Sequence, residues 1–235
     1  MINRNKVFFL LAGFFCCFSS VTAQTSSKGK SASKEAAVSL FDGNTLKGWR
    51  VANHDTLPGV AWSASNGELR FDPSKGHGTD IVSTRTFKDF DFSIDFKISD
   101  GGNSGIKYFL LPNTSLGGEY QIIDDNKHPD AKLGINGNRK TGALYDILPP
   151  NPNKPDKGAE QWNTARIVVK GDNVQHWLNG VKILEFERGS EAFKQAIAQS
   201  KFKTTKGFAE ATSSPILLQA HGDKVSYRNI KIKEL

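Results

Sequence analysis

The sequence predicts an all-β protein, a sandwich of antiparallel sheets with one short helix. Three observations lead to this fold class. Apolar and polar residues alternate with a period of two in "DFSIDFKIS" (Asp91–Ser99), which is typical of a half-buried strand. Short strand-like runs follow one another with Gly- and Asn-rich turns between them, and only "SEAFKQAIAQSKF" (Ser190–Phe202) has helical spacing.

Each expected strand is marked by its own turn signals. The run "GIKYFLL" follows Asp91–Ser99 after a Gly101–Asn103 turn, and Asn179–Gly180 is a strong hairpin signal because both residues accept positive φ. The predicted strands are Asp91–Ser99, Gly105–Leu111, a strand around "GEYQIID" (Gly118–Asp124), three strands within Ala165–Glu187, and two within Pro215–Leu235.

Two segments depart from the strand pattern. Ser190 is placed to cap the helix, whose apolar face contains Phe193 and Ile197. Lys127–Lys157 is rich in Asn, Pro and Gly, and a loop of that length in a compact domain is usually functional or partly disordered.

The N-terminus reads as a targeting segment. Arg4 and Lys6 precede a short apolar run, and Val21 and Ala23 occupy the small-residue positions that a signal peptidase reads. We predict a signal peptide over 1–23, a flexible linker over 24–38, and a single domain over 39–235. The mature chain would have no transmembrane anchor, and the protein is expected to be periplasmic or secreted.

Composition excludes several classes of function. Both cysteines, Cys16 and Cys17, lie in the predicted signal peptide, so the mature chain would have no disulfide or thiol nucleophile. The formal net charge of +7 comes from dispersed basic residues, which does not favour nucleic-acid binding. The sequence has no phosphate-binding loop, no G-x-S-x-G motif and no H-E-x-x-H motif. It carries no signal for an oligomeric state.

The polar residues of "GEYQIID" pose the main functional question. Strand parity puts Glu119 and Gln121 on one face, opposite Tyr120 and Ile122. Asp124 shares the Glu119 face only if the strand bulges, and otherwise caps the strand end. Other predicted strands also present polar residues on one face, namely Asn103 and Lys107, Gln219 and His221, and Tyr145 or Asp146.

Two interpretations of these polar faces are open. In a jelly roll they could line a groove that binds a sugar, because sugars need hydrogen-bonding partners and an aromatic wall. They could equally face solvent, which is the norm for antiparallel sheets. His221 could be a structural hydrogen-bonding residue instead of a catalyst. "DDNKHPD" (Asp124–Asp130) has groups that could hold a divalent cation, although it lacks the spacing of a calcium loop.

Seven motifs in order resemble the 3-keto-disaccharide hydrolase domain family. They are "LFDGNTLKGWR", "GELR", "GGNSGIKYF", "GEYQIIDD", "TGALYDILPP", "QWNTARIVVKGDNVQHWLNG" and "ILLQAHGDKVSYRNIKIKEL". The resemblance covers Ser39–Leu235. It implies a concanavalin A-like jelly-roll sandwich and a periplasmic or secreted enzyme that acts on glycosides oxidised at C3. One departure is Ala220, where family members usually have an acidic or amide residue.

A 3-keto group makes the C2 proton acidic, so a glycoside of this kind can be cleaved by elimination, with or without later hydration. As a hypothesis, Glu119 or His221 is the C2 base. Lys107, or a divalent cation bound as a cofactor, stabilises the enolate, and Tyr145 or Asp124 protonates the leaving group.

The remaining site residues have binding roles in this hypothesis. Asn103, Gln121 and Gln219 bind hydroxyls, and Trp162 either forms a stacking wall or is a core aromatic. The competing functions are a non-catalytic, lectin-like carbohydrate-binding module and a structural envelope protein, because one fold hosts many functions.

Overall fold

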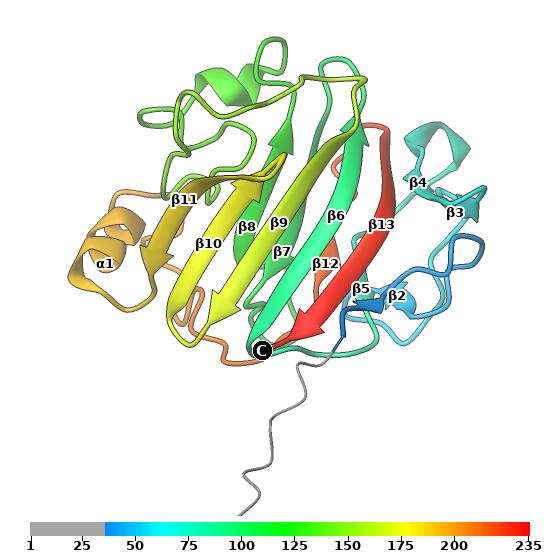
Figure 1. The fold of residues 1–235 in the computed structure, drawn as a ribbon, viewed down its shortest axis with the longest axis horizontal. Helices are drawn as coiled ribbons and strands as arrows, with labels where there is room; N and C mark the ends of the chain where they lie inside the picture. Colours follow the sequence, from blue (N-terminus) through cyan, green and yellow to red (C-terminus); the bar gives the residue numbers. More distant parts are fainter. Residues whose placement is uncertain (1–35) are drawn as a thin grey trace, which may run out of the picture. The chain divides into compact units, whose positions relative to one another are not determined.

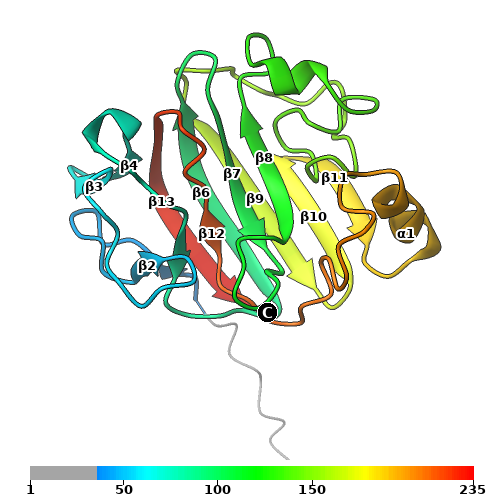
Figure 2. The ribbon, with the colours of Figure 1, turned by 180° about the vertical axis from the view of Figure 1, so that it is seen from behind.

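The protein is described by a computed structural model, in which residues 36–235 are placed. Two antiparallel sheets pack face to face (Figures 1 and 2). The larger sheet has the order β11-β10-β9-β6-β13-β4-β3, with β1 paired to β13, and the smaller has the order β2-β5-β12-β7-β8. The predicted jelly-roll sandwich is confirmed.

The strand bounds follow the predicted alternation closely. The larger sheet consists of β1 (Val38–Ser39), β3 (Trp62–Ser65), β4 (Glu68–Phe71), β6 (Phe90–Ile98), β9 (Asn163–Lys170), β10 (Asn173–Leu178), β11 (Val181–Glu187) and β13 (Val225–Glu234). The smaller consists of β2 (Trp49–Val51), β5 (Ile81–Ser83), β7 (Asn103–Tyr108), β8 (Gly118–Ile123) and β12 (Leu217–Leu218).

The core lies between the two sheets. In β6 every second residue is buried, and Phe92, Ile94 and Phe96 point inward. Ile106 and Tyr120 meet them from the smaller sheet. Full burial of one such side chain contributes about 1.5–3 kcal/mol, so the alternation that predicted the strands also accounts for much of what holds the sheets together.

The predicted hairpin at Asn179–Gly180 is confirmed. Both residues have positive φ, 48° and 84°, as the turn requires. The Asn179 side chain also donates hydrogen bonds of 2.7 Å to Asn163 Oδ1 and to the Pro155 carbonyl oxygen. The turn is therefore tied to the start of β9 as well as to its own strands.

The helix is shorter than predicted. α1 spans Glu191–Ala198, and Ser190 caps it by accepting a hydrogen bond from the Phe193 amide. Beyond it, the Lys201 amide donates to Asp146 Oδ2 at 2.7 Å. The last predicted turn is lost because a carboxylate from another part of the chain captures a backbone donor that a longer helix would have used.

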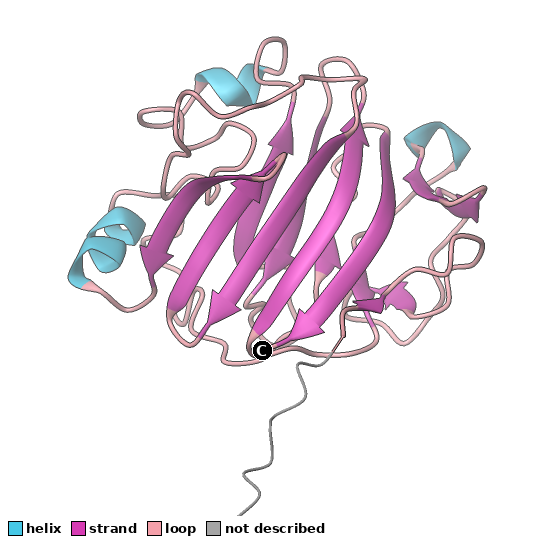
Figure 3. Cartoon of the chain, viewed as in Figure 1, coloured by secondary structure: helices cyan, strands magenta, loops and turns pink. Residues whose placement is uncertain are grey.

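The long Asn/Pro/Gly-rich region is largely irregular, as predicted. Figure 3 shows it as loop with one short helical turn, the 3₁₀ segment η2 (Pro129–Lys132). Its later part runs beside β8, where the Gly142 amide donates to the Gln121 carbonyl oxygen and the Tyr145 amide donates to that of Glu119. A second 3₁₀ turn, η1 (Pro73–Lys75), follows β4.

The N-terminal predictions fall mostly beyond the placed residues. The predicted signal peptide (1–23) and most of the predicted linker (24–38) lie outside the described part of the chain. Val38, the last residue of the predicted linker, pairs with Ile232, so strand structure begins one residue before the predicted domain boundary. Within 36–235, no helix is long and apolar enough to cross a membrane.

A buried histidine joins the two sheets. His176 of β10 donates from Nδ1 to the Gly142 carbonyl oxygen at 2.9 Å and accepts at Nε2 from the Tyr108 hydroxyl at 2.5 Å. Burial of the imidazole lowers the pKa of His176 to about 4. The neutral tautomer is held because both ring nitrogens have partners in the core.

The low pKa of His176 makes folding sensitive to acid. Between pH 6.5 and pH 4 the unfolded chain binds a proton that the folded protein does not, so stability is lost as the pH falls. We expect this group to lower the free energy of unfolding by about 3 kcal/mol over that range. Denaturant titrations of wild type and His176→Gln at pH 7 and pH 4 test it. Equal losses of stability in the two proteins would contradict the assignment.

Candidate active site

Polar side chains line a cavity on the face of the smaller sheet that is turned away from the larger sheet. The cavity measures about 120 Å³ and is lined by Asn103, Lys107, Ser115, Leu116, Gly117, Glu119, Gln121, Tyr145, Lys201, Phe202, Gln219 and His221. Every sequence-predicted site residue except Asp124 and Trp162 is among them. All residues of β7 and β8 are buried, so the alternative of a solvent-facing strand side is wrong for these strands.

Strand register brings the charged pair together. Lys107 of β7 lies directly opposite Glu119 of β8, and Lys107 Nζ is 3.6 Å from Glu119 Oε2. Gly105 shares their face of the sheet. A Cβ at position 105 would lie 2.3 Å from Glu119 Oε1, so the missing side chain makes the space that the carboxylate occupies.

Glu119 is the central ionisable group of the cavity. Burial raises its pKa, and attraction to Lys107, Lys201 and His221 offsets the rise only in part. A carboxylate with a raised pKa is a stronger base than an exposed one once it is ionised. Such perturbed groups in clefts are frequent at functional sites.

Lys201 is a member of the cavity that the sequence analysis missed. Although the residue as a whole is exposed, partial burial of its ammonium group lowers its pKa. Its Nζ lies 4.1 Å from the centre of the Tyr145 ring, close enough for a cation–π contact. Phe202, the next residue, also lines the cavity and was also missed.

A buried ion network fixes both Tyr145 and Lys201. The Tyr145 hydroxyl donates to Asp130 Oδ2 at 2.7 Å, and Arg139 joins Asp130 and Asp146 through contacts of 2.6 and 2.5 Å. Asp146 in turn accepts from the Lys201 amide. Burial and Asp130 raise the pKa of Tyr145 far above its ordinary value. The hydroxyl is therefore a poor acid, which argues against the predicted role of Tyr145 as proton donor.

The three predicted amide side chains all border the cavity. The Gln121 amide fits its surroundings when its nitrogen donates to the Ser104 carbonyl oxygen at 3.1 Å and to Glu119 Oε1 at 3.2 Å. Asn103 Oδ1 and Gln219 Oε1 are buried and have no hydrogen-bonding partner among the described residues. Buried unpaired acceptors are costly, so these two oxygens are suited to receive hydroxyl donors from a ligand.

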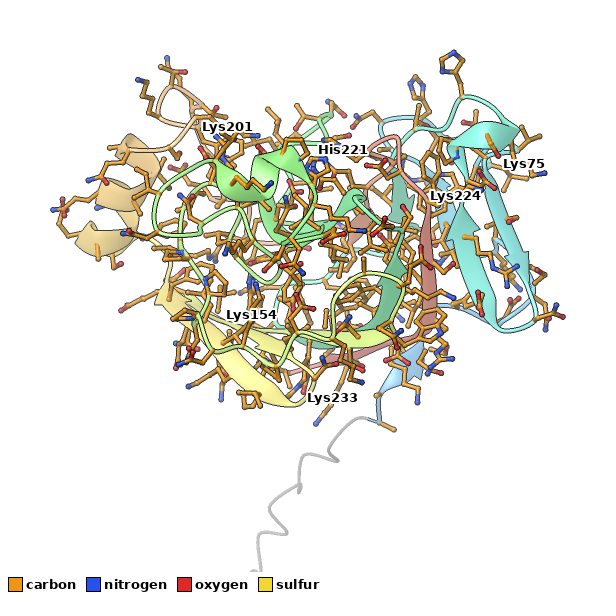
Figure 4. All side chains as sticks on the ribbon, turned by 90° about the horizontal axis from the view of Figure 1, so that it is seen from above. Lys75, Lys154, Lys201, His221, Lys224 and Lys233 are labelled. Carbon is orange, nitrogen blue, oxygen red and sulfur yellow. The ribbon has the colours of Figure 1, made fainter. Side chains whose placement is uncertain are left out.

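His221 stands at the rim of the cavity. The chain after β12 runs beside β7, where the Gln219 backbone amide donates to the Gly105 carbonyl oxygen. The Ala220 backbone amide donates to Asp80 Oδ1 at 2.9 Å. Figure 4 looks onto this end of the sandwich and shows Lys201 on the side of α1 and His221 on the side of Lys75 and Lys224. Asp80, which the sequence analysis also missed, thus positions the segment that carries His221.

Two predicted site residues do not reach the cavity. Asp124 caps the end of β8, where its carboxylate accepts from the amides of Gly101, Asn126 and Lys127. Trp162 packs instead against Arg228 and Lys97, which project from the outer face of the larger sheet. Trp162 is therefore neither a stacking wall nor a core aromatic.

The polar atoms of Asp124–Asp130 are engaged by the protein itself. Asp125 accepts from the Thr141 amide and pairs with Lys154, and His128 Nδ1 accepts from the Asp130 amide. Asp130 binds Tyr145 and Arg139, as described above. Across 36–235, no three His, Cys, Asp or Glu side chains gather in an arrangement suited to a metal ion. The structure therefore does not support the divalent-cation site that the sequence left open for this loop.

The fold and the cavity together define a class: a jelly-roll domain with a candidate active site built on one sheet face. The sequence pattern of the 3-keto-alpha-glucoside-1,2-lyase-like domain matches residues 36–233. The chain belongs to this family, which agrees with the resemblance found in the sequence.

Individual relatives agree with the family assignment. The chain is 33% identical over 228 residues to a 3-keto-disaccharide hydrolase of Bacteroides thetaiotaomicron, covering 84% of this chain and 78% of the relative. Two solved structures of candidate glycosyl hydrolases from Parabacteroides distasonis are similar. The first has a TM-score of 0.76 at 31% identity, with 86% of this chain and 95% of that chain covered. The second has a TM-score of 0.61 at 26% identity, with coverages of 80% and 99%.

Gly105 offers a test of how the site is built. In Gly105→Ala the new Cβ would occupy the position of Glu119 Oε1, so we expect the Glu119 carboxylate to swing away from Lys107 while the fold is kept. A crystal structure and a thermal melt of the variant measure both effects. The matched control is Gly118→Ala on β8, where the nearest atom to a Cβ is 3.4 Å away. An unmoved Glu119 in Gly105→Ala would contradict this account.

Proposed function

We propose that this protein is a carbohydrate-acting enzyme that cleaves glycosides whose sugar carries a keto group at C3. The observation that carries the proposal is the charge pattern of the cavity. Among its lining residues Glu119 is the sole carboxylate, and it is accompanied by Lys107, Lys201 and His221. The family and the named hydrolase relative supply the class of substrate.

One carboxylate beside two ammonium groups suits elimination better than ordinary glycoside hydrolysis. Most glycosidases use two carboxyl groups that flank the scissile bond. A 3-keto sugar needs instead a base for the C2 proton and positive charge near the ketone oxygen, where negative charge develops. The lining of the cavity supplies these groups.

In the proposed reaction Glu119 removes the C2 proton, and the electrons of the C2–H bond move to the ketone oxygen. Lys107 and Lys201 stabilise the resulting enolate. The enolate electrons then form a C1=C2 double bond as the C1–O bond breaks and the C3 ketone reforms. The departing oxygen takes a proton from His221, and a 1,2-unsaturated 3-keto sugar remains. Addition of water across this double bond would give the free 3-keto sugar and complete a hydrolysis.

His221 is the proposed proton donor for two reasons. Tyr145 has its proton committed to Asp130, and Asp124 caps a turn away from the cavity. Lys107 already faces Glu119 at 3.6 Å. His221 stands at the rim, where a leaving group can depart toward solvent, and a protonated imidazole can serve as a general acid.

The orphaned oxygens of Asn103 and Gln219 support a hydroxylated substrate. The cavity is smaller than the roughly 300–1,000 Å³ of pockets that enclose a whole drug-sized ligand. We therefore place only the reacting sugar in it. The export predicted from residues 1–23 fits an enzyme that meets its glycoside outside the cytoplasm, and it stays a prediction.

A non-catalytic carbohydrate-binding module is the second candidate, because a jelly roll with a polar cavity can bind a sugar without reacting. The buried Glu119 favours the enzyme, since a binding module gains nothing from the cost of burying a carboxylate with a raised pKa. Turnover of a 3-keto-glucoside decides between the two functions.

Glu119→Gln tests the base directly. We expect exchange of the C2 proton of a 3-keto-glucoside in deuterated water to slow by at least about 100-fold, the lower range for losing a general base. NMR measures the exchange, and Glu187→Gln, on the exposed edge of β11, is the control. Exchange at the wild-type rate in Glu119→Gln would remove Glu119 as the base.

The pH profile tests the electrostatics around Glu119. Because its pKa is raised above 4.5 and the ionised form is the base, kcat/KM should fall with decreasing pH through an apparent pKa above 4.5. Lys201 is one of the cations that hold this pKa down. In Lys201→Met the acid limb should therefore move to higher pH. A limb that stays in place or moves to lower pH would show that Lys201 does not act on Glu119.

A further inference from the structure

A second hollow adjoins the candidate active site. It measures about 550 Å³ and is lined by Phe71, Pro73, Ser74, Gly76, His77, Gly78, Ala220, His221 and Gly222. His221 lines both cavities. The imidazole therefore stands at the junction between the small, charged cavity and a larger space beside it.

The two cavities differ in their chemistry. The lining of the first contains Lys107, Glu119 and Lys201, whereas that of the second has no charged carboxylate or ammonium. The second offers the His77 imidazole and the Ser74 hydroxyl oxygen, which can accept a hydrogen bond while its proton is donated to Asp72 Oδ1 at 2.6 Å, beside apolar surface. Neutral hydrogen-bonding groups next to apolar surface suit a neutral, hydroxylated ligand.

The walls of the second hollow are held from both sheets. On one side Asp72 caps η1 by accepting from the Ser74 amide at 3.0 Å, and Lys224 Nζ lies 3.3 Å from Asp72 Oδ2. On the other side Asp80 accepts from the Ala220 amide. The space is thus formed by anchored segments on both sides.

Gly78 brings one wall close to the core. A Cβ at this position would lie 2.1 Å from Phe71 Cε2 and 3.0 Å from Ala61 Cβ. Because Gly78 has no side chain, the loop between η1 and β5 packs closely against Phe71 of β4. The opposite side of this loop lines the second hollow. This contact needs glycine for its size, independently of its backbone angles.

We propose that the second hollow is the leaving-group subsite, and that it accepts a neutral, hydroxylated aglycone such as the second sugar of a disaccharide. This inference rests on the proposed function. With the 3-keto sugar in the small cavity, the glycosidic oxygen lies near the junction at His221. His221 gives its proton to that oxygen as the C1–O bond breaks, and the released alcohol lies between the Ser74 and His77 side chains.

The experiment compares two substrates that share the 3-keto-glucosyl group, a 3-keto-disaccharide and a methyl 3-keto-glucoside. The measured quantity is the ratio of kcat/KM for the disaccharide to kcat/KM for the methyl glycoside. Ser74→Trp fills the hollow and should lower this ratio at least tenfold, mainly through KM. His77→Ala, which removes one partner without adding bulk, should lower it about threefold or more and serves if Ser74→Trp does not fold.

The control is Ser63→Trp, on the exposed side of the edge strand β3 and outside both cavities. It should leave the ratio at the wild-type value. A ratio unchanged in both Ser74→Trp and His77→Ala would overturn the subsite, because the second sugar would then lie elsewhere.

A binding measurement separates this inference from the proposed function. Glucose, as a probe for the released sugar, should bind the wild-type protein in saturation-transfer NMR, and Ser74→Trp should weaken that binding. Turnover of neither keto substrate by the wild type would refute the proposed function while glucose binding still reports on the hollow. Glucose binding that is absent, or that Ser74→Trp leaves intact, would overturn the subsite.

Discussion

The pairing of β7 with β8 is the constraint on which the site depends. Their register sets Lys107 opposite Glu119 and Gly105 opposite Gln121. A buried carboxylate costs several kcal/mol unless charge and hydrogen bonds compensate it, and here the compensation comes from the strand opposite. A slip of one residue would turn Glu119 into the core and Tyr120 into the cavity, so the packing of the apolar face also holds the polar face in register.

The core and the site are therefore two sides of the same strands. Tyr108 and Tyr120 fill the space between the sheets, and Tyr108 binds the buried His176 of the larger sheet. His176 also donates a hydrogen bond to the Gly142 carbonyl oxygen, and Gly142 begins the segment that carries Tyr145. The wall of the cavity beside Glu119 is thus anchored through the core to the opposite sheet.

Much of the fold and part of the site follow from strand parity. Parity separates Glu119 and Gln121 from Tyr120, and it is read directly from the alternation of residue types. Strand parity also indicates the position of Trp162. Thr164 and Arg166 follow it at intervals of two residues and point outward from β9, so Trp162 is expected on the same outer side. Parity left two positions open for Asp124, on the Glu119 face or at the end of the strand. The structure places it at the strand end, where it acts as a cap.

Lys201 and Asp80 could not be found in this way. Lys201 follows a helix that sequence periodicity extends to Phe202, and the helix ends early because Asp146, far away in the sequence, takes the Lys201 amide. Asp80 acts on the backbone of Ala220 across a still longer separation of 140 residues. Tertiary hydrogen bonds of this kind carry no local pattern, so they become visible only when the chain is folded.

The network around Arg139 explains why a site with two lysines and one carboxylate keeps a defined shape. Arg139 joins Asp130 to Asp146, and these carboxylates hold Tyr145 and the Lys201 backbone. The like charges of Lys107 and Lys201 would otherwise favour their separation. The shape of the cavity is maintained by ion pairs outside it, which leaves Glu119, His221 and the two ammonium groups available for a substrate. A positively charged cavity with a single base is what an enolate requires, and a second carboxylate near the ketone oxygen would oppose its formation.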